Sequence, residues 1–253
     1  MQIQLVRSAT LRINYANQLL LVDPYLAARF TRPSYTGASP NPLVELPFPP
    51  EEVISGAGLV LISHMHSDHF DPAAKALLPR DIPIACQPSD RAALEQLGFR
   101  RLLPLEDSLT WNGITITGTP CQHGSGTVLD EMGSASGFVL RGPGEPVVYW
   151  AGDTVWCPAV AEVIAREQPD VIVTHSCGAV WGSGVLILMD AAQTVEVCRA
   201  APGSTVVATH MEALDHATVS RAQLRAIASS EGISAEQLRI PLDGEILTFT
   251  FNL

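Results

Sequence analysis

The sequence Leu59-Val60-Leu61-Ile62-Ser63-His64-Met65-His66-Ser67-Asp68-His69 joins an apolar run to three imidazoles and a carboxylate. The apolar run is typical of a buried strand, and the polar residues form the turn that follows it. Borderline cations such as zinc bind neutral imidazole nitrogens and carboxylate oxygens. Only seven histidines occur in the 253 residues, and three lie in this turn. We therefore predict a transition-metal site here, in preference to a hydrated polar loop or a nucleic-acid contact.

Three further donors follow apolar, strand-like segments elsewhere in the chain. His123 comes after a strand expected over 113–119, Asp153 follows a strand over 146–151, and His210 follows a strand over 204–208. Each of these residues alone would be more typical of a hydrogen-bonded polar group at a sheet edge. Because the arrangement is repeated, we predict that the three complete the metal site.

On these residues the chain resembles the metallo-β-lactamase superfamily, whose signature is a His-x-His-x-Asp-His turn followed by a later His, an Asp and a final His. The resemblance implies that the first metal is held by His64, His66 and His123. It implies that the second metal is held by Asp68, His69 and His210, and that Asp153 bridges the two ions. It covers most of the chain and identifies the fold and the metal site better than the substrate.

Within the superfamily, the chain is similar to the branch that includes ascorbate-6-phosphate lactonase. This similarity depends on the layout of segments such as 152–156 and 208–211. It implies a lactone or phosphorylated lactone as substrate, although a shared layout need not mean a shared substrate.

The order of elements predicts an α+β fold, a four-layer αββα sandwich in a single domain over 1–253. A Pro-rich loop over 24–50 is too long for a simple connector, and we expect a substrate lid or an assembly surface there. Strands are expected over 2–6, 10–15, 18–22, 58–63, 113–119, 136–141, 146–151, 170–174, 204–208 and 245–250. Helices are expected over 72–78, 90–97, 158–167, 190–200 and 218–230.

The expected chemistry is hydrolysis of a small ester-like substrate. Two ions about 3.5–4 Å apart can hold a hydroxide, because bound water has its pKa lowered toward about 7. Asp153 would set the metal spacing, and Asp68 would both bind the second ion and hold the proton of the nucleophile. His175, at the end of a predicted strand, is a candidate for donating a proton, contacting substrate or orienting a ligand. His216 is as consistent with a surface position as with function.

Three other functions are alternatives to hydrolysis of an ester-like substrate. A phosphodiesterase would need the same metal pair, a mononuclear-iron redox enzyme would need an altered ligand set, and a metal-binding sensor would lack turnover. Two divalent ions are expected as cofactors, with zinc the default and manganese or iron as alternatives.

The charge of the chain argues against one class of binding partner. The net charge is −11 and the chain has a single lysine, Lys75, which argues against electrostatic binding of nucleic acid. A small substrate is expected, and an anionic one remains open because the metals would dominate the local electrostatic field.

There is no apolar run of transmembrane length, and the N-terminus is typical of a first strand rather than a signal peptide. We expect no membrane association, a cytoplasmic location and five reduced cysteines, and self-association through the Pro-rich loop is plausible.

Overall fold

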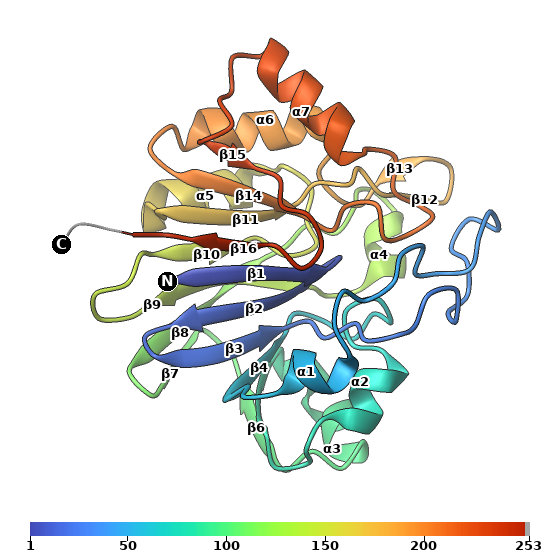
Figure 1. The fold of residues 1–253 in the computed structure, drawn as a ribbon, viewed down its shortest axis with the longest axis vertical. Helices are drawn as coiled ribbons and strands as arrows, with labels where there is room; N and C mark the ends of the chain where they lie inside the picture. Colours follow the sequence, from blue (N-terminus) through green and yellow to red (C-terminus); the bar gives the residue numbers. More distant parts are fainter. Residues whose placement is uncertain (251–253) are drawn as a thin grey trace.

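The computed structural model describes residues 1–250 and contains two seven-stranded sheets that pack face to face (Figure 1). The first sheet contains, in spatial order, β16 (Ile246–Thr248), β1 (Gln2–Arg7), β2 (Thr10–Tyr15), β3 (Gln18–Val22), β4 (Leu59–Ile62), β5 (Pro83–Cys86) and β6 (Arg101–Pro104). The second sheet contains β15 (Leu238–Arg239), β14 (Thr205–Thr209), β11 (Val171–His175), β10 (Val148–Trp150), β9 (Ser136–Arg141), β8 (Ile114–Pro120) and β7 (Ser108–Trp111). A separate hairpin joins β12 (Val180–Trp181) to β13 (Val185–Leu186).

Both sheets follow the same plan. In the first sheet β16, β1, β2 and β3 pair antiparallel, and β3, β4, β5 and β6 pair parallel. In the second sheet β7 to β10 pair antiparallel, and β10, β11, β14 and β15 pair parallel. The two sheets and their helices therefore form two similar halves.

Strand β4 shows why both faces of the first sheet are buried. Leu59 and Leu61 pack into the core between the sheets, whereas Val60 and Ile62 pack into the core beneath the helices. Side chains along a strand point alternately to opposite faces, so a continuous apolar run is what a doubly covered strand requires.

Helices cover the outer face of each sheet. The first sheet is covered by α1 (Pro50–Ile54), α2 (Pro72–Leu77) and α3 (Arg91–Gln96), and the second by α5 (Pro158–Glu167), α6 (Ala191–Ala200) and α7 (Arg221–Ser230) (Figure 1). The 3₁₀ helix η1 (Pro88–Asp90) precedes α3, and α4 (Val128–Met132) lies near the β12–β13 hairpin. The predicted four-layer αββα sandwich is confirmed; the assignment of 1–253 to one domain stays a prediction.

One predicted helix begins later than expected. The segment expected over 218–230 becomes helical only at Arg221, because the backbone N–H groups of Thr218 and Val219 both donate to the carbonyl of Cys177. Ser220 then caps the helix in a capping box with Gln223. The sequence analysis also missed the strands β5, β6, β7, β12, β13 and β15, none of which is longer than four residues, and the five-residue helices α1 and α4. The last strand ends at Thr248 rather than at 250.

The Pro-rich segment is irregular, as expected, until α1 begins at Pro50. It folds back on itself at a bridge between Arg32 and Asn41 and is fixed to the other half of the molecule by the Leu43 N–H, which donates to the Ala213 carbonyl at 2.8 Å.

Within residues 1–250, none of the helices has the length and apolar character needed to cross a membrane.

Candidate metal centre

The predicted donors all leave the ends of strands at one edge of the sandwich. His64, His66, Asp68 and His69 follow β4, and His123, Asp153 and His210 follow β8, β10 and β14. His175 is the last residue of β11. The carboxyl ends of parallel strands meet at the same sheet edge, so a loop from each strand reaches a common space. The structure therefore brings together every residue that the sequence analysis assigned to the metals.

Two of these strand ends use a left-handed backbone. Gly152 has φ +70°, and a Cβ atom at this position would lie 2.8 Å from the Trp150 ring and 3.0 Å from the Ser136 carbonyl. His210 has φ +64°, which is uncommon for a residue with a side chain. Its N–H donates to the Ser8 carbonyl at 2.9 Å, so a contact with the other sheet stabilises this conformation.

The donors form two groups that share one carboxylate. The donor atoms of each group lie within 4.8 Å of one another: His64, His66, His123 and Asp153 in the first, and His69, Asp153, His175 and His210 in the second. Asp68 lies beside the second group, since its Oδ2 is 3.8 Å from His69 Nε2 and 3.5 Å from His210 Nε2.

A single oxygen of Asp153 lies between the two groups. Its Oδ2 is 3.7 Å from His64 Nε2 and 3.3 Å from His123 Nε2, both of the first group, and 3.1 Å from His69 Nε2 of the second. Two atoms that are each about 2.0–2.1 Å from one tetrahedral zinc are about 3.3 Å apart. The separations at Asp153 are therefore close to those that two ions sharing this carboxylate would need.

A buried carboxylate, Asp23, orients two of the imidazoles. Its Oδ2 accepts hydrogen bonds from His69 Nδ1 at 2.7 Å and from Ser63 Oγ at 2.6 Å. Because the Ser63 hydroxyl proton goes to Asp23, Ser63 Oγ accepts from His64 Nδ1, at 2.9 Å. Both imidazoles then carry their proton on Nδ1, which leaves the lone pair of Nε2 directed at the centre. Sequence reasoning missed Asp23, although it follows β3 as the other site residues follow their strands.

Three other histidines are held in the same manner. His123 Nδ1 donates to the Ile187 carbonyl at 3.0 Å, and His210 Nδ1 lies 3.6 Å from the Cys177 sulfur. His175 Nδ1 donates to Asp153 Oδ1 at 2.5 Å. His175 therefore contacts the shared carboxylate, and it is not among the residues that line the cavity described below.

Four buried ring nitrogens of the cluster form no hydrogen bond with the protein within residues 1–250. Among the described residues, the Nε2 atoms of His64, His69, His175 and His210 are buried and accept or donate no hydrogen bond. Four buried, unsatisfied nitrogens in one cluster would be costly in a purely structural site. Imidazoles with free lone pairs beside carboxylates match the donor set that zinc and related cations bind, so the residues present fit a metal centre.

The pKa values show how strongly this cluster attracts positive charge. Burial opposes ionisation of Asp153, but His69 and His123 hold its pKa well below the usual range. Burial disfavours the charged form of His69, but Asp153 and Asp23 raise its pKa well above the usual value. Burial and the neighbouring His69 lower the pKa of His64. The carboxylates thus stay ionised and favour a cation in their midst.

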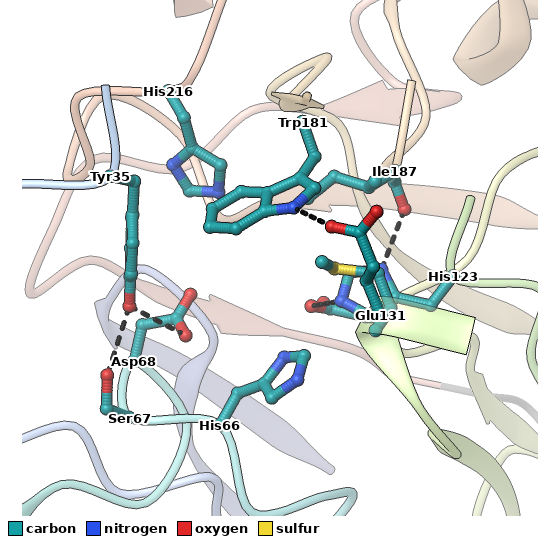
Figure 2. Close-up of a pocket in the computed structure, with 11 residues that line it drawn as sticks. Tyr35, His66, Ser67, Asp68, His123, Glu131, Trp181, Ile187 and His216 are labelled. Atoms are coloured by element: carbon teal, nitrogen blue, oxygen red, sulfur yellow. Dashed lines mark hydrogen bonds and ion pairs between the residues drawn. The ribbon is translucent and has the colours of Figure 1, made fainter. Parts of the chain in front are cut away.

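A cavity of about 200 Å³, which opens to solvent, lies against the cluster (Figure 2). His66, Asp68, His123 and Asp153 reach it from the candidate centre. Its other walls are residues that the sequence analysis did not assign to the metals, namely Tyr35, Ser67, Glu131, Met132, Trp181, Ile187 and His216. His216, for which a surface position was equally open, is only 6% exposed and lines the cavity.

The Pro-rich segment reaches this cavity through Tyr35, whose hydroxyl donates to Asp68 Oδ1 at 3.2 Å. Trp181 forms another wall and donates from Nε1 to Glu131 Oε2 at 2.9 Å (Figure 2). The only sequence signals for these walls were the length of the Pro-rich segment and the glycines around Trp181. Trp156, which follows the candidate ligand Asp153 in sequence, does not line the cavity and packs against the core between the second sheet and its helices.

Comparison with known proteins identifies the family. The family model described as "Beta-lactamase superfamily domain" matches residues 19–211. "UPF0173 protein YddR" of Bacillus subtilis (strain 168) is 35% identical over 255 aligned residues, 98% of this chain and 100% of the relative. The crystal structure of an isothiocyanate hydrolase from Delia radicum gut bacteria is 34% identical, with a TM-score of 0.92 over 99% of both chains. A "possible metal-dependent hydrolase" from Veillonella parvula DSM 2008 is 30% identical, with a TM-score of 0.94 over 98% of this chain and 99% of that one.

Proposed function

This chain belongs to the β-lactamase superfamily and is a metal-dependent hydrolase of it, and from this premise we propose that it uses two divalent ions to hydrolyse a small isothiocyanate. The dinuclear part of the proposal is carried by Asp153 Oδ2, which lies within 3.7 Å of Nε2 atoms from both groups of donors. The substrate part draws on the isothiocyanate hydrolase that resembles this chain along its whole length.

The proposed ligands keep the assignment made from the sequence. His64, His66 and His123 hold one ion, Asp68, His69 and His210 hold the other, and Asp153 joins both. His175 positions Asp153 through their hydrogen bond of 2.5 Å. Burial lowers the pKa of His175 to about 4, so its ring is neutral and donates only through Nδ1 in this arrangement. We retain zinc as the first metal to test, with manganese and iron as alternatives.

The cavity favours an uncharged substrate over the anionic one left open above. Of the described residues that line it, none is a lysine or arginine, and Glu131 stands at its wall. Met132, Trp181 and Ile187 offer apolar surface to the part of the substrate that does not react. An isothiocyanate is a small, neutral electrophile with its reactive carbon between nitrogen and sulfur, which suits these walls. A phosphorylated lactone would place its phosphate against carboxylates.

The reaction would add water to the isothiocyanate. The oxygen of water bonds to the central carbon, the C=N π bond opens, and the nitrogen takes up one proton of the water. The resulting thiocarbamic acid then passes its remaining O–H proton to the nitrogen as the C–N bond breaks, which gives an amine and carbonyl sulfide. When bound, the ions lower the pKa of water toward about 7 and stabilise negative charge on the substrate. The carboxylate of Asp68, beside the second group, accepts the proton that water loses. Tyr35 keeps that carboxylate oriented through its hydroxyl.

The metal content of the chain tests the site. Protein purified without chelators and without a histidine tag should carry two ions per chain by elemental mass spectrometry, and Asp153→Ala and His66→Ala should carry fewer and lose hydrolysis. A variant that kept both ions and full activity would overturn the ligand assignment. One iron per chain with oxygen uptake would favour the redox alternative.

A substrate panel tests the reaction. The metal-loaded protein is assayed with a neutral isothiocyanate, a lactone, a phosphorylated lactone and a chromogenic bis-phosphodiester. Release of amine and carbonyl sulfide from the isothiocyanate supports the proposal. Turnover of the lactone alone would return the function to the ascorbate-6-phosphate lactonase-like prediction, turnover of the diester alone would favour a phosphodiesterase, and metal binding without any turnover would favour a sensor.

A further inference from the structure

One carboxylate outside the metal centre organises the tip of the Pro-rich segment. Asp215 accepts hydrogen bonds from the Tyr35 and Thr36 N–H groups at 3.0 and 3.1 Å and from Thr36 Oγ1 at 2.7 Å. Ser34 Oγ and Asn41 Nδ2 also donate to it. Burial opposes its ionisation, but these donors lower the pKa of Asp215 far below the usual range. The side chain is thus an ionised anchor for residues 34–41.

Asp215 lies in the segment that follows β14, between the proposed ligand His210 and the cavity residue His216. Its own N–H donates to Asn41 Oδ1 at 2.9 Å, so the two segments are linked in both directions. Ala213 and Leu214 pack with Tyr25, Ala27 and partly buried Tyr35 in a small core of their own. The wall of the cavity is therefore assembled from segments about 180 residues apart.

The anchor places Tyr35 and His216 against each other. Their ring centroids lie 4.8 Å apart with an interplanar angle of 67°, and the Tyr35 and Trp181 rings are 6.2 Å apart. The His216 carbonyl accepts from the Val180 N–H at 3.3 Å, which fixes it to β12 beside Trp181. Figure 2 shows His216 and Trp181 on one side of the cavity, across from His66.

The ring of His216 is built into this wall without a protein partner. Its Nδ1 is buried, and within residues 1–250 nothing donates to it or accepts from it. No ring nitrogen of His216 is engaged by the described side chains or backbone, whereas Tyr35 and Trp181 both hydrogen-bond to neighbouring carboxylates. Burial lowers the pKa of His216, so the ring is neutral and offers one N–H donor and one acceptor. A buried polar ring in a cavity wall with both functions unused is suited to a ligand.

We propose that His216 is a substrate-contacting residue that hydrogen-bonds the reacting end of the substrate, and that Asp215 positions it together with Tyr35. This inference rests on the proposed hydrolysis. In that reaction the ring N–H of His216 donates to the substrate nitrogen, which gains electron density as water bonds to the adjacent carbon. The hydrogen bond strengthens as this charge develops, so it favours the transition state over the bound substrate.

The test compares His216→Phe, which keeps a ring and removes the donor, with His216→Gln, which restores an N–H donor. Steady-state kinetics with the isothiocyanate should show kcat lower by about ten- to hundredfold in His216→Phe with KM changed less than threefold, because a hydrogen bond to developing charge is lost. His216→Gln should recover most of kcat. Both should retain the metal content of the wild type, which separates this role from metal binding.

Asp215→Asn tests the positioning role. The amide cannot accept from all five donors, so the 34–41 tip should loosen and KM should rise severalfold with metal content unchanged. Asp170→Asn is the matched control, because Asp170 also accepts from a backbone N–H, that of Val147, but lies at the opposite end of β11 from His175.

Each outcome bears on a separate claim. Wild-type kcat/KM in a His216→Phe variant with normal metal content overturns the role of His216. If His216→Phe does not fold, His216→Ala is compared with His216→Gln, and equal rates in these two overturn it. An unchanged KM in Asp215→Asn overturns the positioning role. A wild-type protein that hydrolyses no isothiocyanate overturns the proposed function, and this inference with it.

Discussion

Replacing Asp23 by Asn should weaken the metal centre without removing a ligand. Asp23 is fully buried and accepts from three donors, the Ser63 N–H at 2.8 Å, Ser63 Oγ at 2.6 Å and His69 Nδ1 at 2.7 Å. An amide has one acceptor oxygen, so an Asn oriented toward the Ser63 N–H presents its own N–H₂ to His69. The imidazole would then carry its proton on Nε2, the nitrogen that faces Asp153 at 3.1 Å.

The size of the effect follows from this change of tautomer. A protonated Nε2 cannot bind a metal, so His69 must either shed the proton or leave the ligand set. Removing a partner that orients a metal-binding histidine typically costs about 10- to 100-fold in metal affinity. This corresponds to about 1.4–2.8 kcal/mol at about 1.4 kcal/mol per factor of ten. The loss should be largest for the ion held by His69 and His210. The other ion should also bind less tightly, because Ser63 Oγ, which orients His64, loses its acceptor on Asp23.

Competition with a chromophoric chelator measures the two affinities separately. The wild type should titrate with two tight sites, and Asp23→Asn should weaken both, the site of His69 more than the site of His64. Asp170→Asn, the control distant from the centre, should match the wild type. Unchanged affinities for both ions in Asp23→Asn would show that Asp23 does not set the tautomer of His69. An unchanged affinity at the site of His64 alone would show that Ser63 does not pass the effect on to His64.

Three other perturbations have defined outcomes. Gly152→Ala should lower the free energy of unfolding by about 1–3 kcal/mol, measured by urea denaturation, because the new Cβ would meet the Trp150 ring at 2.8 Å in a left-handed backbone; an unchanged midpoint would contradict this. The pKa of His210 is raised from 6.5 to about 10, so the folded protein holds a proton that the unfolded chain releases between these pH values. The free energy of unfolding of chelator-treated protein should therefore fall as the pH rises from 6.5 toward 10. A free energy of unfolding that rises over this range would contradict the raised pKa of His210. His175→Phe should leave Asp153 without its donor and reduce metal affinity about 10- to 100-fold, and unchanged chelator competition would show that His175 does not position that carboxylate.

Much of the architecture could be predicted because it depends on local patterns. The run Leu59–Ile62 is apolar at every position, which only a strand covered on both faces accommodates, and the helices α2 and α5 begin at Pro72 and Pro158. The start of α7 could not be predicted in the same way. Thr218 and Val219 would fit a helix, but their N–H groups are taken by the Cys177 carbonyl, a contact about 40 residues away that no local pattern records.

The same distinction holds at the site. Few side chains bind a transition metal, so His64 and Asp153 stand out in the sequence once a buried strand precedes them. The residues that orient or surround them are of types that occur everywhere. Asp23, Tyr35 and Asp215 differ from other polar residues only in what they contact, and those partners lie 46, 33 and up to 181 residues away.

The candidate ligands come from both sheets, which makes the metal centre part of the fold as well as of the chemistry. His64 and His69 leave β4 of the first sheet, and His123 and His210 leave β8 and β14 of the second. Protein contacts already join the sheets at this edge, since the His210 N–H donates to the Ser8 carbonyl. An ion bound by ligands from both sheets would add a second connection at the same place, so its binding free energy would add to the free energy of folding. Burying the imidazole nitrogens without hydrogen bonds lowers the stability of the metal-free protein. Binding of a metal to the same nitrogens would offset that loss.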